Sequence, residues 1–396
     1  MKIGLVVSDD LDYGLDLAPT LAEAGVSVTL YLSQTNLALY LGQPASASSP
    51  DQLVAALYQK GLLPQNIPVR LFRFPRMRDP RSLAAALHLR RRIEADNPDV
   101  VHLLVGPGEL WMAVLSCLMR RRRPIVSTMI VPEPNLGDRL PVSILRMIAR
   151  LLVLGSEVVI VNGREQVELV RKLYAARRVV HVPLVPRISA AKWADRDRDR
   201  DEEPGTVLFT GKAQPRKGLE YLVRAQPFVT RRVPDAKFLL AAHGDDLARC
   251  RAFIADETKF EIHDGFLTSA ELAEYFQRAS LVALPYLSAS TSGLLTTAYV
   301  FGKPVVATRV GALPEYVPEE ATGLLVPPAD AESLAEAIVR LLTDDELRQR
   351  MGSNAREWVR LEQKKVAGQT IGVYETARTG FRTSQKIPAA LTIRQE

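Results

Sequence analysis

The stretch VLFTGKAQPRKGLEYLV, residues 207–223, decides the fold class. Residues 207–210 predict a buried strand, a basic loop follows at 211–217, and Gly218 precedes a helical pattern at 219–229. Strand, loop and helix in this order are the repeating unit of a parallel α/β sheet. Ligands of such sheets bind at the carboxyl ends of the strands, so we expect a site at this loop.

The same alternation extends through both halves of the chain. One highly charged run, DRDRDRDEE at 195–203, interrupts it. A run without apolar residues has nothing to bury, so it predicts a linker between two α/β domains. The predicted segments are a first domain at 1–190, a linker at 191–205, a second domain at 206–355, a helix crossing back to the first domain at 356–378, and a tail at 379–396.

The composition is that of an ordinary globular protein, with 47% hydrophobic and 24% charged residues among 396. Cys117 and Cys250 are far apart in the sequence, which predicts neither a disulfide framework nor a metal site and fits a reducing cytosol. Asp9 and Asp10 end the first apolar run early, so we expect no signal peptide. We also expect no membrane span and no bound metal.

Four motifs in the second half resemble the GT4 family of glycosyltransferases; they lie at 210–218, 234–240, 302–315 and 322–328. The first half resembles the family more weakly, at 97–102 and 157–162. The resemblance implies the GT-B architecture, which has two Rossmann-like doubly wound α/β domains facing a central cleft. It also implies an acceptor-binding first domain and a donor-binding second domain. The expected reaction is retaining transfer from a nucleotide sugar, with no metal and no other cofactor.

The loop at 211–217 carries the positive charge that this reaction requires. When a nucleoside diphosphate departs, negative charge builds on its phosphates, and fixed cations and N–H groups stabilise it. Lys212 and Lys217 stand where the family places its Arg and Lys for this task, and Arg216 adds a third cation. A solvated basic turn is the alternative interpretation.

Further donor-binding candidates follow the predicted strand at 281–284. Ser292, Gly293 and Leu294 are predicted to begin a helix whose N–H groups and dipole face the same phosphates. An ordinary serine cap is the alternative. Glu315 follows a Gly-rich turn, where it either lines the donor cleft or serves only as a helix-start carboxylate.

The sequence departs from the family at its paired glutamates. Ala289 and Thr297 occupy the two positions, which are eight residues apart. The second glutamate normally holds the ribose hydroxyls, whereas Thr297 offers one hydroxyl. The first lies near the reacting sugar, where Ala289 has no reactive group. The resemblance therefore indicates a divergent branch that lacks both carboxylates.

The acceptor side is less well defined. His102 is the candidate catalytic residue, predicted to end a strand at the crevice, and a packed core histidine is the alternative. The family's histidine motif after the strand at 125–128 is missing, and Glu133 is a polar candidate in its place. In the family's usual retaining mechanism the leaving phosphate accepts the proton of the acceptor, so no side-chain nucleophile is expected.

The net charge of +6 raises the question of anionic partners. Residues 141–154 form a basic amphipathic pattern, typical either of a membrane-surface helix or of a packed helix between domains. The arginines at 120–123 favour weak contact with an anionic membrane. Aromatic residues do not interleave with the basic clusters, so nucleic acid is not expected. We expect a cytoplasmic protein with peripheral contact at the inner face of the membrane.

Together these features predict a glycosyltransferase that moves a sugar from a nucleotide-diphosphate sugar to a lipid-linked or saccharide acceptor, in glycolipid or surface-polysaccharide synthesis. The alternative is a non-catalytic GT-B scaffold that binds a nucleotide or a partner protein, which Ala289 and Thr297 support. Lys212, Arg216 and Lys217 favour the enzyme, because a scaffold freed from donor binding has no reason to keep three such cations. A third interpretation is sugar epimerisation on the same fold. It is not favoured, because the sequence lacks the acid and base residues that we expect for this reaction.

Overall fold

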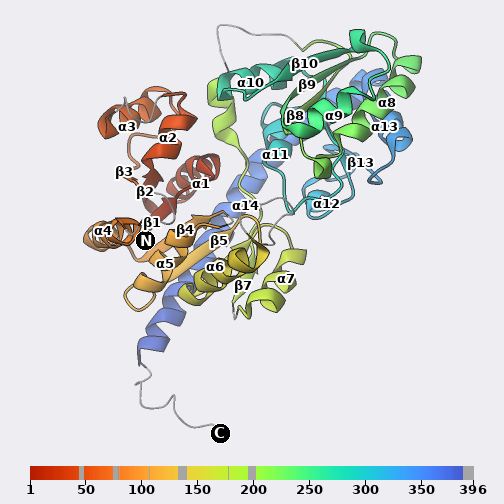
Figure 1. The fold of residues 1–396 in the computed structure, drawn as a ribbon. Coiled ribbons are helices and arrows are strands. Elements are labelled where there is room, and N and C mark those ends of the chain that lie inside the picture. The colour runs from red at the N-terminus through yellow and green to blue at the C-terminus, as the bar shows by residue number, and fades with distance from the viewer. Residues whose placement is uncertain are drawn as a thin grey trace. The chain divides into compact units, whose positions relative to one another are not determined.

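The computed structural model describes residues 1–43, 49–74, 79, 81–106, 108–132, 141–176, 178–194 and 202–386, with side chains to 383. The chain divides into two compact units. Unit 1 comprises Met1–Val185 and the segment from Lys364, and unit 2 comprises Pro186–Gln363. Each unit contains a parallel sheet with helices packed around it (Figure 1).

Unit 1 is built on seven parallel strands in the order β3-β2-β1-β4-β5-β6-β7. The central strands are apolar and buried on both faces, as expected when helices cover both sides of a sheet. The strand order reverses between β1 and β4, which places the crevice of this sheet at their carboxyl ends. The strands are β1 Lys2–Val7, β2 Ser27–Ser33, β3 Val69–Phe72, β4 Val100–Val105, β5 Ile125–Met129, β6 Val158–Val161 and β7 Val179–His181. The helices are α1 Leu11–Glu23, α2 Gln34–Tyr40, α3 Pro50–Gln59, α4 Arg81–Asp96, α5 Leu110–Met119, α6 Val142–Gly155 and α7 Glu165–Tyr174.

Unit 2 has six parallel strands in the order β10-β9-β8-β11-β12-β13, and its order reverses between β8 and β11. The strands are β8 Thr206–Lys212, β9 Lys237–His243, β10 Phe260–Asp264, β11 Leu281–Leu284, β12 Val305–Thr308 and β13 Gly323–Val326. The α-helices are α8 Leu219–Arg232, α9 Asp245–Arg251, α10 Ser269–Arg278, α11 Gly293–Val300, α12 Leu313–Tyr316 and α13 Ala331–Thr343. They are followed by α14 Asp345–Lys386, which belongs to unit 1 from Lys364 on. Three short 3-10 helices are η1 Ile188–Trp193, η2 Pro215–Lys217 and η3 Glu257–Lys259.

The predicted fold class is confirmed, because both sheets are parallel, doubly wound and Rossmann-like. Two boundaries differ from the prediction. Residues from Pro186 belong to unit 2, because η1 packs against α10 and α11. The last helix, predicted at 356–378, runs from Asp345 to Lys386 and includes the start of the predicted tail. Glu133 and most of the charged run lie outside the described residues.

His102 lies in the middle of β4 and not at its end, and it is 1% exposed. Its Nδ1 lies 2.8 Å from the hydroxyl of Tyr374 on α14, and its Nε2 lies 2.8 Å from Thr128 Oγ1. Burial lowers its pKa to about 3, so the ring is neutral at pH 7. This position contradicts the predicted contact between His102 and substrate. The ring instead ties α14 to the sheet of unit 1.

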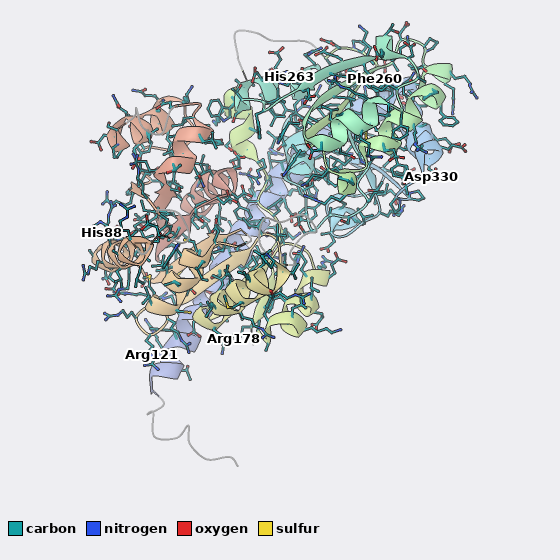
Figure 2. All side chains as sticks on the ribbon, in the orientation of Figure 1. His88, Arg121, Arg178, Phe260, His263 and Asp330 are labelled. Atoms are coloured by element: carbon teal, nitrogen blue, oxygen red, sulfur yellow. The ribbon has the colours of Figure 1, made fainter. Side chains whose placement is uncertain are left out.

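The neutral His102 ring makes the stability of unit 1 depend on pH. In the unfolded chain a histidine titrates near pH 6.5, whereas the folded chain protonates His102 only near pH 3. The free energy of unfolding therefore falls as the pH drops from 6.5 toward 3, by about 1.4 kcal/mol per unit. We expect His102→Gln to remove this dependence, as measured by urea unfolding at pH 7.5, 6 and 5. His88→Gln, at an exposed position of α4 (Figure 2), is the control that should retain the pH dependence. Equal slopes in all three proteins would contradict the assignment.

Candidate functional site

The predicted basic loop follows β8 at the switch point of unit 2. Lys212 is the last residue of β8, and Arg216 and Lys217 lie in η2, directly before α8. Gly218 has a φ of 65°, and a Cβ there would come within 1.9 Å of the Pro285 carbonyl oxygen. Only glycine satisfies both conditions. This close approach brings the loop after β8 against the loop after β11.

Two further contacts join these loops. The Arg216 carbonyl oxygen accepts a hydrogen bond from the Leu287 N–H at 2.8 Å. The Lys217 ammonium lies 3.6 Å from the centroid of the Tyr286 ring, which is 1% exposed. An aromatic face attracts a cation placed over it, so the buried ring holds the ammonium in position. The predicted cation Lys217 is therefore fixed at the carboxyl edge of the sheet.

Helix α11 begins beside this cation. The hydroxyl of its N-cap residue, Ser292, lies 3.3 Å from the Tyr286 hydroxyl, which connects the helix start to the ring beneath Lys217. Leu294 packs over Gly211 at the end of β8, where a Cβ would lie 3.1 Å from Leu294 Cδ1. The first N–H groups of α11 and the positive end of its dipole thus share an edge with Lys217. This arrangement favours an anion.

The remaining predicted donor residues flank this cluster. Thr297 is 6% exposed, and its hydroxyl donates a hydrogen bond to the Gly293 carbonyl oxygen at 2.9 Å. The Thr297 side chain therefore supports the first turn of α11. Glu315 is exposed in the first turn of α12. Because α12 follows β12, the neighbour of β11, Glu315 stands at the same edge of the sheet.

An aromatic pair beside Lys212 was not predicted from the sequence. Phe266 is 83% exposed, and its ring centroid lies 3.8 Å from that of His243, the last residue of β9. Burial, followed by the charge of Lys212, lowers the pKa of His243. An exposed ring face at this edge can stack on a planar ligand. The sequence carried no motif for it, because His243 ends β9 and Phe266 lies in the loop that follows β10.

A polar cluster also lies at the switch point of unit 1. Ser8 and Asp9 follow β1, and Glu109 precedes α5; the Ser8 hydroxyl donates a hydrogen bond to Glu109 Oε2. Burial raises the pKa of Glu109 to about 8, and burial together with Asp10 raises the pKa of Asp9. Glu109 is therefore mostly protonated at pH 7 and can exchange a proton near pH 8. The sequence gave no sign that Glu109 joins Asp9 at this crevice.

The described ranges hold neither a candidate metal site nor a membrane-spanning helix. They contain no group of three or more His, Cys, Asp or Glu side chains that could hold a metal ion. No helix within them is both long and apolar enough to cross a membrane. Cys117 and Cys250 are free thiols.

Two family models match the chain, one in each half. The model of the glycosyl transferases group 1 matches residues 204–344, and that of the glycosyl transferase 4-like domain matches residues 12–184. A D-inositol 3-phosphate glycosyltransferase of Kribbella flavida is 26% identical over 92% of this chain and 90% of its own. A phosphatidyl-myo-inositol mannosyltransferase of Mycolicibacterium smegmatis is 33% identical over 44% of this chain and 46% of its own.

Solved structures share the fold at low identity. Sucrose-phosphate synthase from Thermosynechococcus elongatus superimposes with a TM-score of 0.66 at 20% identity, covering 95% of this chain and 98% of its own. Anabaena HepE in complex with UDP and glucose gives a TM-score of 0.62 at 16% identity, covering 95% and 100%. These likenesses support the two Rossmann-like units described above.

The close approach at Gly218 predicts an unusually costly substitution. A residue with a Cβ pays about 1–2 kcal/mol for left-handed backbone, and forcing atoms into a packed site costs about 1–3 kcal/mol more. We expect Gly218→Ala to lower the free energy of unfolding by about 2–5 kcal/mol. Gly205→Ala is the matched control, because Gly205 has a φ of 81° and a Cβ there meets nothing nearer than 3.7 Å. Chemical denaturation of both variants measures the difference. Equal losses would show that the Pro285 contact imposes no constraint.

Proposed function

Because this chain belongs to the group 1 glycosyltransferases of the GT4 family, we propose that it transfers a sugar from a nucleotide-diphosphate sugar to an acceptor hydroxyl, with retention of configuration. The membership itself confirms the predicted transferase. The observation that carries the donor assignment is the joined pair of loops in unit 2. There, Lys217 and the start of α11 meet over the buried Tyr286 ring.

In this proposal the joined loops bind the diphosphate of the donor. Lys212, Arg216 and Lys217 supply positive charge, and the first N–H groups of α11, at Gly293 and Leu294, donate hydrogen bonds to phosphate oxygens. These groups stabilise the charge that develops as the nucleoside diphosphate departs. Tyr286 holds the Lys217 ammonium in place before the donor arrives, so little reorganisation is required during the reaction.

We propose that retention proceeds without a covalent intermediate on the protein. Ala289 and Thr297 supply no carboxylate where the family usually has two. Neither position therefore offers a carboxylate on which a covalent sugar intermediate could form. We propose instead that the departing phosphate accepts the proton of the acceptor hydroxyl, which attacks from the same face of the sugar. Cations that hold the phosphate also fix the atom that accepts this proton.

We propose that the acceptor is a lipid-linked or saccharide hydroxyl, in glycolipid or surface-polysaccharide synthesis. The names of the relatives describe transfer to inositol phosphate and to phosphatidylinositol, which are polyols, one of them a lipid. Helix α6 supports a membrane location at the cytoplasmic face. Met147 and Leu154 are 53% and 61% exposed, and Arg150 lies between them on the same helical face. The exposed Arg121 follows α5, which packs against α6 (Figure 2).

The donor assignment predicts loss of nucleotide binding in Lys217→Ala. We expect the wild-type protein to bind one of UDP, GDP and ADP in calorimetry, and the variant to bind it about 10- to 100-fold more weakly, because a charge-assisted bond is lost. Lys237→Ala is the control, since Lys237 begins β9 at the opposite, amino edge of the sheet. A folded wild-type protein that binds none of the three would refute the donor site.

The membrane proposal predicts that Met147→Glu weakens binding to anionic vesicles. Burying a methionine contributes about 1.5–3 kcal/mol, so we expect a loss of about tenfold or more in co-sedimentation with phosphatidylglycerol vesicles. Leu361→Glu, at an exposed position on α14, should bind as the wild type does. Equal binding of wild type and Met147→Glu, or no preference for anionic over zwitterionic vesicles, would refute a role for α6.

A further inference from the structure

Arg187 places a cation at the start of α11. It is the second residue of unit 2 and directly precedes η1. A Cβ at Gly293 would lie 3.0 Å from Arg187 Nε and 3.2 Å from one of its terminal nitrogens. The guanidinium therefore lies against the first residue of the helix whose N–H groups face the proposed phosphate site.

Packing fixes this position. Pro186 on one side of Arg187 is buried, and Ser189 on the other is 3% exposed. The η1 turn that follows packs against α10 and α11. The backbone of Arg187 is therefore held by unit 2, and Gly293 leaves the space that its guanidinium occupies. A Cβ at 293 would require the guanidinium to shift by a few tenths of an ångström.

The charges at this position favour an anion. The guanidinium and the positive end of the helix dipole both attract negative charge. The ammonium of Lys217 adds positive charge to the same edge, linked to the helix through Tyr286 and Ser292. A phosphate placed between these groups interacts favourably with all three. A guanidinium also has five N–H donors in a planar fork, which suits two phosphate oxygens at once.

We propose that Arg187 binds the diphosphate of the nucleotide-sugar donor, together with Lys217 and the N-terminus of α11. This inference rests on the proposed donor site. It adds a cation from a segment outside the basic loop, about 30 residues earlier in the sequence. It also assigns Gly293 a second purpose, because the absence of a side chain there admits the guanidinium. In this proposal the first residues of unit 2 contact the donor directly.

The test compares Arg187→Gln and Arg187→Lys with the wild type. The probes are the nucleoside diphosphate that the wild type binds among UDP, GDP and ADP, and the corresponding nucleoside. We expect Arg187→Gln to weaken diphosphate binding about 10- to 100-fold, as loss of a charge-assisted bond does, while nucleoside binding measured by ligand-observed NMR stays unchanged. Arg187→Lys keeps the charge but loses the fork, so its affinity should fall between the two.

Arg231→Gln is the matched control, because Arg231 lies in the last turn of α8, a helix of 14 residues that starts at the phosphate loop. A helix of that length spans about 20 Å, so no effect is expected. Unchanged diphosphate affinity in Arg187→Gln would overturn the inference and leave the proposed function intact. Equal weakening of nucleoside and diphosphate would assign Arg187 a structural role and also overturn it. Failure of the wild type to bind any diphosphate would instead remove the proposed function.

Discussion

The proposed donor site depends on one steric constraint, the approach of Gly218 to the Pro285 carbonyl oxygen. The constraint joins two loops that leave neighbouring strands at the point where the strand order of the sheet reverses. Once joined, the loops stack Lys217 on Tyr286 and bring Ser292 to the same ring. The positive charges and the positive end of the helix dipole repel one another at this edge, so a backbone contact holds them together beside the aromatic floor.

The loss of the paired glutamates has a physical consequence for this edge. Without carboxylates at 289 and 297, nothing at those positions offsets the cations, so the edge is more strongly attractive to a multiply charged anion. Thr297 uses its hydroxyl to bond the Gly293 carbonyl oxygen, which stiffens the first turn of α11. Where the family usually has a glutamate that can reach a ligand, Thr297 therefore stabilises the backbone N–H donors of α11 instead.

The sequence predicted features that depend on neighbours in the chain. Alternating strands and helices, the basic loop and the glycine at 218 all follow from local patterns, and the structure contains each of them. Contacts between distant residues could not be predicted. His102 looked like a crevice residue because its partner, Tyr374, is 272 positions away. Glu109 contacts Ser8, and Arg187 lies against Gly293, although the residues of each pair are far apart in the sequence. Local sequence patterns carry no information about such contacts.

Helix α14 belongs to both units, since its first part packs in unit 2 through Trp358 and its later part packs in unit 1 through Tyr374. During synthesis on the ribosome, the strands of unit 1 emerge before those of unit 2, yet Tyr374, the partner of the fully buried His102, emerges after them. Unit 2 up to α13 has therefore been synthesised before His102 can contact α14. Unit 1, although synthesised earlier, must wait with its seven-stranded sheet not yet covered by α14.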